Sequence, residues 1–518
     1  MVFPDALPLV PLPTETVVGD GRMPVTAASR IIGDTPATEI LRAAWGRRGA
    51  SAPDVADDGT APVAGDIVLR LEPGTAADLP APAPRAGEGY QLRIDDHVEL
   101  TAPTEAGLFY GVQTLLQLLR PDAHDGGWSI PRVVIRDAPR FAHRGVMLDV
   151  VRHFFDVDEV RRFIDATSAL KFNRLHLHLT DDQGWRVHID AWPLLTERAS
   201  ATAVDGDRGG FYTKDDYRAI VAHAASRHMV VIPEIDLPGH THAIGVAYPD
   251  LVEEPVLNDG LVAQAAELGQ DLPVKGEPYR GWGVGHSSVR IRDERTYGFV
   301  TDVVREIAEM TPGPYIHLGG DESLGTTQDD FDHFAERATR IVVEAGKIPM
   351  GWHEMGAAEG IAEGTVGQYW GMTAPSASHA AHAAHFVERG GALVMSAADA
   401  TYLDMKYDAD FPLGLSWAGL TDVRTAYEWE PTAVLDLPDD AILGTEAPLW
   451  SETTRTLSDV ERLVFPRAAA AAEVAWSPRH ADGRTWESFR TRVGGMAPLW
   501  KAERIDFHPA AEIAWSDR

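Results

Sequence analysis

The sequence contains no cysteine. Disulfide bridges, thiolate metal sites and a cysteine nucleophile are therefore excluded. The missing disulfides do not decide the compartment, because a chain of 518 residues can bury a core large enough to be stable without them.

Long apolar runs are missing as well. No run approaches the roughly 20 residues that a membrane-spanning helix needs, so we expect nothing that crosses a bilayer. The first residues, Met1 to Asp5, lack a basic segment followed by a continuous apolar one, so no signal peptide is visible. We expect a cytoplasmic location, although a chain whose leader had been removed would look the same.

Positive charge is scarce. The chain has 46 Lys and Arg against 78 Asp and Glu, which gives a net charge of −32. Such a surface repels phosphate backbones and anionic lipids, so we expect no nucleic-acid or membrane partner and a neutral substrate instead. The 44% hydrophobic share with 24% charge is ordinary for a globular protein and excludes a disordered chain, a coiled coil or a collagen-like repeat.

The sequence divides into two predicted domains. Residues 1–138 contain short β-like runs at 66–71 and 90–94 and one helical pattern at 104–119, which indicates a small α+β domain. The stretch 137–140, with Pro139 inside it, is a credible boundary. Residues 139–518 form the second domain.

Short apolar runs alternate with amphipathic helical patterns from residue 143 onward, which is typical of a (β/α)8 TIM barrel. The predicted helices include 157–170, 214–228, 294–310 and 328–345, and helices are expected in the remaining gaps as well. The stretch 255–290, which carries Trp282, is long for a loop and so favours a functional role. The predicted strands are 143–150, 173–179, 229–235, 314–319, 348–352, 365–370, 392–396 and 442–446.

Carboxylates and tryptophans follow these predicted strands, at the end where barrel enzymes carry their active sites. This combination fits a carbohydrate site, because aromatic faces pack on sugars while acids and arginine bind hydroxyls. The sharpest element is the pair Asp321 and Glu322, which follows Gly319 and Gly320 at the end of an apolar run. Two carboxylates held close in a partly desolvated pocket have their pKa values pushed apart, so one can stay protonated as an acid while the other stays ionised.

The chain resembles glycoside hydrolase family 20, the β-N-acetylhexosaminidases. The matching motifs are collinear between residues 143 and 476, and residues 1–138 resemble the accessory domain of the family with weaker motif support. The motifs are Asp149-Val-Val-Arg-His-Phe154, His176-Leu-His-Leu-Thr-Asp-Asp182, Glu234-Ile-Asp-Leu-Pro-Gly-His240, Gly319-Gly-Asp-Glu322, Tyr402-Leu-Asp404 and Trp450-Ser-Glu452.

The resemblance implies an exo-acting, retaining enzyme in which the 2-acetamido oxygen of the substrate is the nucleophile and an oxazolinium intermediate forms. Glu322 would be the general acid and then the base, and Asp321 would accept the acetamido N–H. Tyr402 would donate its hydroxyl to the acetamido oxygen. Asp181 and His240 would support Glu322, with Asp236 bracing them.

The resemblance also implies which residues hold the sugar. Arg152, Asp404 and Glu452 would bind its outer hydroxyls, which favours a terminal residue. Trp352, Trp370 and Trp450 would form the walls of the sugar pocket. Trp417 would contact the substrate at the rim, although packing within the protein explains a tryptophan there equally well. We expect a small-molecule or oligosaccharide substrate ending in GlcNAc or GalNAc, no cofactor, no metal, and a monomer or homodimer.

Two other classes of function remain open at this stage. The pair His176 and His178 has the spacing of metal-dependent amidohydrolase barrels, although packing inside the barrel is the more frequent reason for such a pair. A non-catalytic sugar-binding barrel is the second alternative, and the presence of both Asp321 and Glu322 argues against it. The natural substrate also stays open between a chitin oligomer, a glycoconjugate and a wall-derived sugar.

Overall fold

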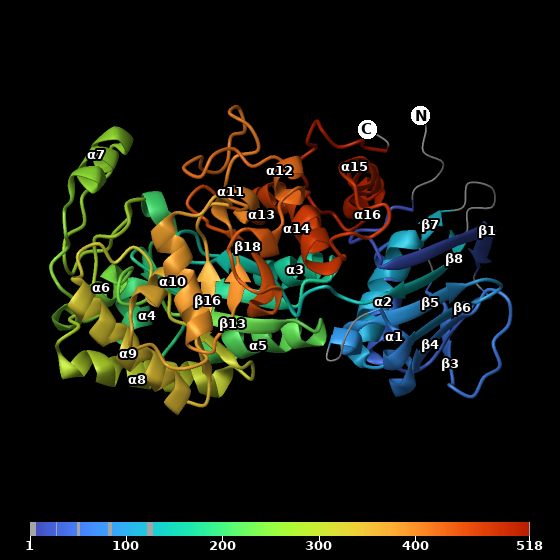
Figure 1. Cartoon of the computed structure of the whole chain (residues 1–518), viewed down its shortest axis with the longest axis horizontal. Coiled ribbons are helices and arrows are strands. Elements are labelled where there is room, and N and C mark those ends of the chain that lie inside the picture. Colours follow the sequence, from blue (N-terminus) through green and yellow to red (C-terminus); the bar gives the residue numbers. More distant parts are fainter. Residues whose placement is uncertain (1–6, 27, 49–51, 81–84, 122–127, 517–518) are drawn as a thin grey trace.

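The structure, a computed structural model, describes residues 7–26, 28–48, 52–80, 85–121 and 128–516. A sheet domain and a closed barrel lie next to each other along the longest axis of the molecule (Figure 1). The segment Met1 to Asp5 lies outside the described residues. Within those ranges, no helix has both the length and the apolar character that a bilayer crossing requires.

The first domain is a mixed sheet with helices α1 (Pro36–Arg47) and α2 (Glu105–Leu118). Helix α2 is apolar around its whole circumference and almost every residue in it is buried, because it contacts the sheet and also reaches the barrel, where Tyr110 packs on Trp476. The strands, in spatial order, are β1 (Glu15–Val25), β8 (Trp128–Asp137), β5 (Tyr90–Ile94), β6 (Val98–Ala102), β4 (Ile67–Leu71), β2 (Arg30–Ile32) and β3 (Asp54–Ala56), with β7 (Arg120–Pro121) paired to β8.

The second domain is a closed barrel of eight parallel strands, so the predicted TIM barrel behind a small α+β domain is confirmed. All eight predicted strands are present, most of them shorter at the ends, and β18 pairs with β9 to close the ring. The strands are β9 (His143–Asp149), β10 (Arg174–His178), β13 (Val230–Glu234), β14 (Tyr315–His317), β15 (Ile348–Trp352), β16 (Val366–Tyr369), β17 (Leu393–Met395) and β18 (Ile442–Leu449).

The predicted barrel helices are also present, and further helices surround them. The predicted ones are α3 (Val157–Ser168), α5 (Lys214–Ser226), α8 (Glu294–Met310) and α9 (Gln328–Glu344). The others are α4 (Leu194–Ala199), α6 (His242–Ala247), α7 (Asp259–Leu268), α10 (Ala377–Glu388), α11 (Ala398–Thr401), α12 (Val423–Tyr427), α13 (Leu457–Val464), α14 (Arg467–Trp476), α15 (Trp486–Gly494) and α16 (Ala497–Ala502).

Two expectations about the gaps between strands were wrong. No α-helix lies between β15 and β16, where a single 3-10 turn (His353–Ala357) is found instead. The glycines at 356, 360 and 364 disfavour a helix there. The stretch 255–290 is not a plain loop, since it contains α7. This helix has local start and stop signals: Asn258 accepts a hydrogen bond from the Leu261 N–H at 2.9 Å, and Gly269 ends it with a φ of 66°.

One buried cluster of charged and polar groups joins the two domains. Asp137, the last residue of β8, pairs with the Lys171 ammonium at 3.0 Å and accepts hydrogen bonds from the Tyr90 hydroxyl at 2.7 Å and the Trp476 indole at 3.0 Å. Asp137 is 0% and Lys171 1% exposed. Burial lowers the pKa of Lys171 and outweighs the attraction of Asp137. Among the described residues, Asp137 is therefore the one carboxylate that forms an ion pair with the buried Lys171 ammonium.

We predict that Asp137→Ala destabilises the protein by about 3–5 kcal/mol, because it leaves the Lys171 ammonium buried without a counter-ion. Urea unfolding followed by tryptophan fluorescence measures this loss. Asp95→Ala is the matched control, since it removes an exposed ion pair with Arg132 and should cost less than about 1 kcal/mol. A loss at Asp137 as small as that of the control would contradict the prediction.

Candidate active site

The predicted site residues converge at the carboxyl ends of the barrel strands. Ten of the twelve line one cavity of about 300 Å³: Asp321, Glu322, His240, Arg152, Trp370, Tyr402, Asp404, Trp417, Trp450 and Glu452. The other two, Asp181 and Trp352, are buried beneath it. Asp181 reaches the cavity through His240, and the ring of Trp352 packs 5.9 Å from that of Trp450. The structure therefore places all twelve in one region.

The acid pair owes its position to the two glycines that precede it. Gly319 and Gly320 adopt φ values of 67° and 98°, a region that favours glycine, and a side chain at Gly319 would overlap the carboxylate of Asp236. Glu322 also has a positive φ, 46°, which is uncommon for a residue with a side chain and typical of strained functional positions. The turn thus aims both acids at the cavity.

The two acids differ in environment. The Asp321 side chain is almost fully buried, whereas about a third of the Glu322 side chain is exposed. Burial raises the pKa of Asp321 to about 6, the charge of Glu322 adds to the rise, and His240 opposes it. Asp321 therefore changes protonation state near neutral pH, where an ordinary aspartate is fully ionised.

His240 links the acid pair to Asp181. Its Nε2 lies 3.5 Å from Glu322 and 3.8 Å from Asp321, and its Nδ1 lies 3.1 Å from Asp181. Burial alone would lower the pKa of His240, but Asp181, Asp236 and Asp321 outweigh it and raise this pKa well above its ordinary value. A protonated imidazole therefore stands between Asp181 on one side and the acid pair on the other.

Alternating imidazoles and carboxylates continue from Asp181 into the barrel core. His178 lies 2.9 Å from Asp181 and 2.5 Å from Glu234 through its two ring nitrogens. His176, two residues earlier on β10 and so on the same face, lies 3.0 Å from Glu234 and 2.8 Å from Glu446. All of these side chains are buried. Both histidines of the His-x-His pair therefore belong to a buried ion-pair chain.

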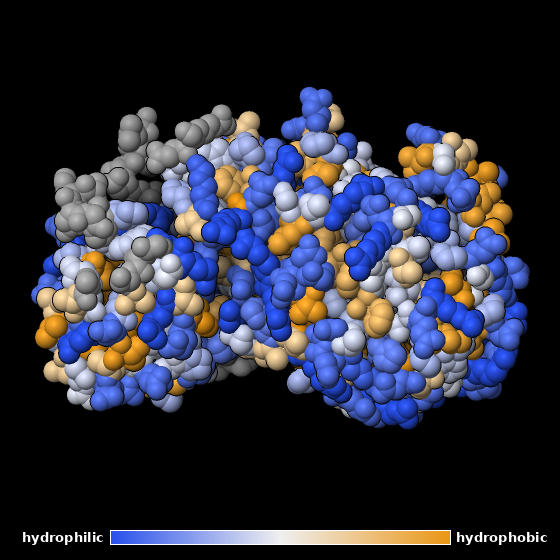
Figure 2. Space-filling model, turned by 180° about the vertical axis from the view of Figure 1, so that it is seen from behind, coloured by the Kyte–Doolittle hydropathy of each residue, from blue (hydrophilic) through white to orange (hydrophobic). Residues whose placement is uncertain are grey.

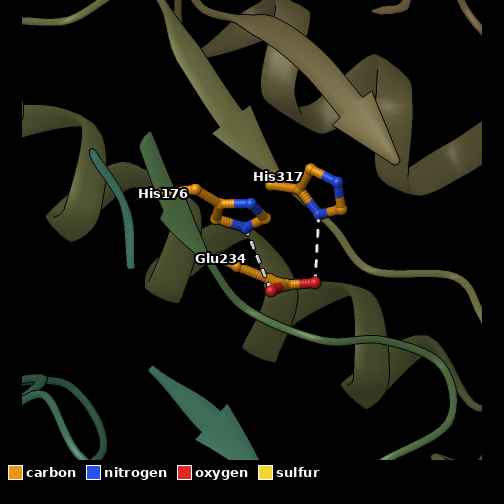
Figure 3. Close-up of side chains that lie close together, drawn as sticks. All are labelled: His176, Glu234 and His317. Carbon is orange, nitrogen blue, oxygen red and sulfur yellow. Dashed lines mark ion pairs between the residues drawn. The ribbon is translucent and has the colours of Figure 1, made fainter. Parts of the chain in front are cut away.

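Figure 3 shows one of four groups of buried His, Asp and Glu among the described residues whose spacing could suit a metal ion: His176 and His317 approach the two oxygens of Glu234 at 3.0 and 3.1 Å. Burial would lower the pKa of His176, but Glu446 and Glu234 raise it to about 9. The pKa of His317 is instead lowered, chiefly by burial. The close contacts of both histidines with Glu234 favour ion pairing and hydrogen bonding as their role.

Three polar side chains on one side of the cavity are suited to binding hydroxyls. Arg152 is fixed by ion pairs with Asp149 at 3.3 Å and Asp181 at 2.8 Å. Burial raises the pKa of Asp404 well above its usual range and raises that of Glu452. Both oxygens of Asp404 and one of Glu452 are buried without a hydrogen-bond donor among the described residues. Buried acceptors left in this state are costly, so a ligand with hydroxyl donors would satisfy them.

Aromatic rings line the same cavity and its rim. Trp370 and Trp417 meet edge to face with centroids 5.9 Å apart, and Tyr402 meets Trp417 in the same way at 5.7 Å. Trp417 is 50% exposed and therefore stands on the rim rather than in the core. Trp352 instead donates its indole N–H to Glu234 at 2.9 Å in the floor. The rings that line the cavity offer flat apolar faces to a sugar.

Four further residues line the cavity that the motifs did not identify: Gln264, Trp282, Val284 and Leu415. Three of them belong to the stretch 255–290, whose length and tryptophan were the only signals for a functional role. Leu415 follows no strand directly and carried no signal in the sequence.

Both domains match sequence models of one protein family. Residues 141–479 match the model for glycosyl hydrolase family 20, catalytic domain, and residues 6–138 match the model for domain 2 of that family. The β-N-acetylhexosaminidase of Cellulomonas fimi is 38% identical over 453 residues, which cover 86% of this chain and 84% of the relative.

Solved structures agree over nearly the full length. A glycoside hydrolase family 20 β-N-acetylglucosaminidase superposes with a TM-score of 0.88 at 50% identity, covering 98% of this chain and 99% of the other. The Streptomyces plicatus N-acetyl-β-hexosaminidase, solved in complex with Thio-NAglucal, superposes with a TM-score of 0.87 at 40% identity, covering 100% and 99%. With the catalytic-domain match spanning well over half of the sequence, the chain belongs to glycosyl hydrolase family 20, a family of glycoside hydrolases.

Proposed function

We propose that the protein is an exo-acting, retaining β-N-acetylhexosaminidase that releases terminal β-linked GlcNAc or GalNAc without a metal or cofactor. The observation that carries the proposal is the pairing of a buried Asp321 with a more exposed Glu322 around one protonated His240. The names of the relatives, which describe β-N-acetylhexosaminidases and a β-N-acetylglucosaminidase, support the sugar class.

In the first step, the 2-acetamido oxygen of the substrate attacks the anomeric carbon while the bond to the leaving oxygen breaks. This substrate-assisted route is a known exception to the use of a carboxylate nucleophile. Glu322 gives its proton to the leaving oxygen. Ionised Asp321 accepts the acetamido N–H and stabilises the positive charge of the oxazolinium ring, and the Tyr402 hydroxyl donates to the acetamido oxygen.

In the second step, a water molecule adds to the anomeric carbon from the face that the leaving group vacated. Glu322, now a carboxylate, takes a proton from this water, and the bond between the anomeric carbon and the acetamido oxygen breaks. Two inversions at the same carbon give retention. His240, held at its Nδ1 by Asp181, lies 3.5 Å from Glu322 and can orient the Glu322 carboxylate for this step.

The sugar itself is held by the polar and aromatic side chains that line the cavity. Asp404 and Glu452 accept hydrogen bonds from its outer hydroxyls, and Arg152 donates to them. Trp370, Trp450 and Trp417 pack on its apolar faces, with Trp352 supporting the floor below Trp450. Because the polar clamp recognises free hydroxyls, the bound sugar is a terminal one.

We predict that Glu322→Gln lowers kcat/KM about 10²–10⁴-fold on substrates with a sugar or alkyl leaving group, since these need a proton on the leaving oxygen. On a dinitrophenyl substrate, whose leaving group needs no proton, the loss in the first step should be far smaller. Steady-state kinetics on both substrates measures the difference. Equal losses on the two would contradict the acid role.

We predict that the acid side of the pH profile reports Asp321. Because its pKa is about 6 and the ionised form is required, kcat/KM should fall as pH drops below 6, approaching about tenfold per pH unit. Asp321→Asn cannot ionise, so it should lower turnover about 10²–10³-fold and abolish that limb of the profile. A variant that keeps the limb unchanged would assign it to another group.

The nucleophile is tested by the substrate alone. Aryl β-N-acetylglucosaminides and aryl β-glucosides differ in the acetamide and share the leaving group, so their rates isolate its contribution. We expect the glucoside to react at least about 10³-fold more slowly, because it lacks the intramolecular nucleophile. Comparable rates would overturn the substrate-assisted mechanism.

A further inference from the structure

The stretch 255–290, between α6 and α8, forms one wall of the catalytic cavity. Its two ends are held together by a bridge between Val252 and Val289, and it contributes Gln264, Trp282 and Val284 to the cavity lining. Helix α7 projects from the barrel at the upper left of Figure 1. None of the three lining residues belongs to the catalytic motifs.

Helix α7 is fixed on one face only. Leu261 and Ala265 are buried, and a side chain at Gly283 would overlap Leu261, so the helix rests directly on the segment that carries Trp282. Two other apolar residues of the helix, Val262 and Leu268, are exposed by 41% and 45%. Figure 2 shows apolar residues gathered over this projection, at the upper right of the view. The wall is therefore supported from behind by a packed helix.

Asp205 fastens this wall to the rest of the barrel. Its Oδ1 accepts hydrogen bonds from the Trp282 indole N–H at 3.2 Å and the Gln270 amide at 3.1 Å. Its Oδ2 pairs with Arg455 at 2.6 Å, and its backbone N–H donates to the Arg280 carbonyl at 2.9 Å. Segments that are distant in the sequence thus hold the Trp282 indole in one place.

This fastening point lies beside the hydroxyl-binding side of the cavity. Val204, next to Asp205, donates its backbone N–H to the Arg152 carbonyl at 2.9 Å. Arg455 follows Glu452 by three residues. Trp282 lines the same cavity as Arg152 and Glu452, and Asp205 links its indole to the segments that carry these two residues.

The geometry points to Trp282 as a specificity-determining residue that closes the nonreducing end of the cavity. This inference rests on the proposed function and names a group that contributes to exo action beside the polar clamp of Arg152, Asp404 and Glu452. The indole, fastened by Asp205, excludes substrates whose terminal sugar carries a substituent on an outer hydroxyl. Steric exclusion of this kind lowers the rate on the substituted substrate and leaves the unsubstituted one unaffected.

The test compares nitrophenyl β-N-acetylglucosaminide with its 3-O-methyl and 4-O-methyl derivatives. The discrimination ratio is kcat/KM on the free sugar divided by kcat/KM on the methylated one. We expect Trp282→Ala to lower the ratio at least about tenfold for one derivative or both, a magnitude ordinary for the shape of a pocket. Trp282→Phe keeps most of the ring and should retain most of the discrimination.

Val262→Ala, on the exposed face of α7, is the matched control and should leave both ratios unchanged. Ratios within twofold of the wild type in Trp282→Ala would overturn the inference, as would an equal fall of kcat/KM on all three substrates, which marks a purely structural role. Calorimetry, which measures the binding of GlcNAc and its two methyl ethers, tests the inference about Trp282 separately from the proposed function. If the wild type bound only the unmethylated sugar and hydrolysed none of the substrates, the proposed activity would be refuted and the inference about Trp282 would stand.

Discussion

The buried chain of carboxylates and imidazoles in the barrel core is the constraint on which the site depends. Each charge taken out of water costs several kcal/mol unless a partner compensates it, and here each histidine of β10 lies between two acids. His178 and Arg152 together hold Asp181 ionised, since they lower its pKa well below the usual range against the effect of burial. Asp181 in turn fixes His240, and His240 faces the acid pair.

The same burial has opposite results for two sets of acids. Asp181, Glu234 and Glu446 have cationic partners that lower their pKa values despite burial. Asp321 and Asp404 have too few, and burial raises their pKa values. Asp181, Glu234 and Glu446 thus have their ion-pair partners within the protein and support its structure. Asp321 and Asp404 line the cavity, where a ligand can supply the missing hydrogen bonds.

The sequence predicted the barrel well because buried parallel strands read as short apolar runs, and polar residues at their carboxyl ends mark the site. The resemblance to the family named ten of the residues that line the cavity, eight of them within its motifs. The motifs could not show that Trp352 lies under the cavity floor, because burial depends on how Trp450 packs over it. A helix between β15 and β16 was predicted wrongly, because the regular alternation of strands and helices was extended across the glycines at 356, 360 and 364.

The stretch 255–290 shows where this kind of prediction ends. Its helix has a clear cap in Asn258 and a clear stop in Gly269, so local signals alone would have identified α7. No local signal indicates that Asp205 contacts Trp282, which is 77 residues away in the sequence, or Arg455, which is 250 residues away. The reaction chemistry determines which residue types occupy the motif positions, whereas tertiary contacts determine where the stretch 255–290 lies against the cavity. The specificity of the site therefore has to be read from the folded structure, because it depends on contacts that no motif records.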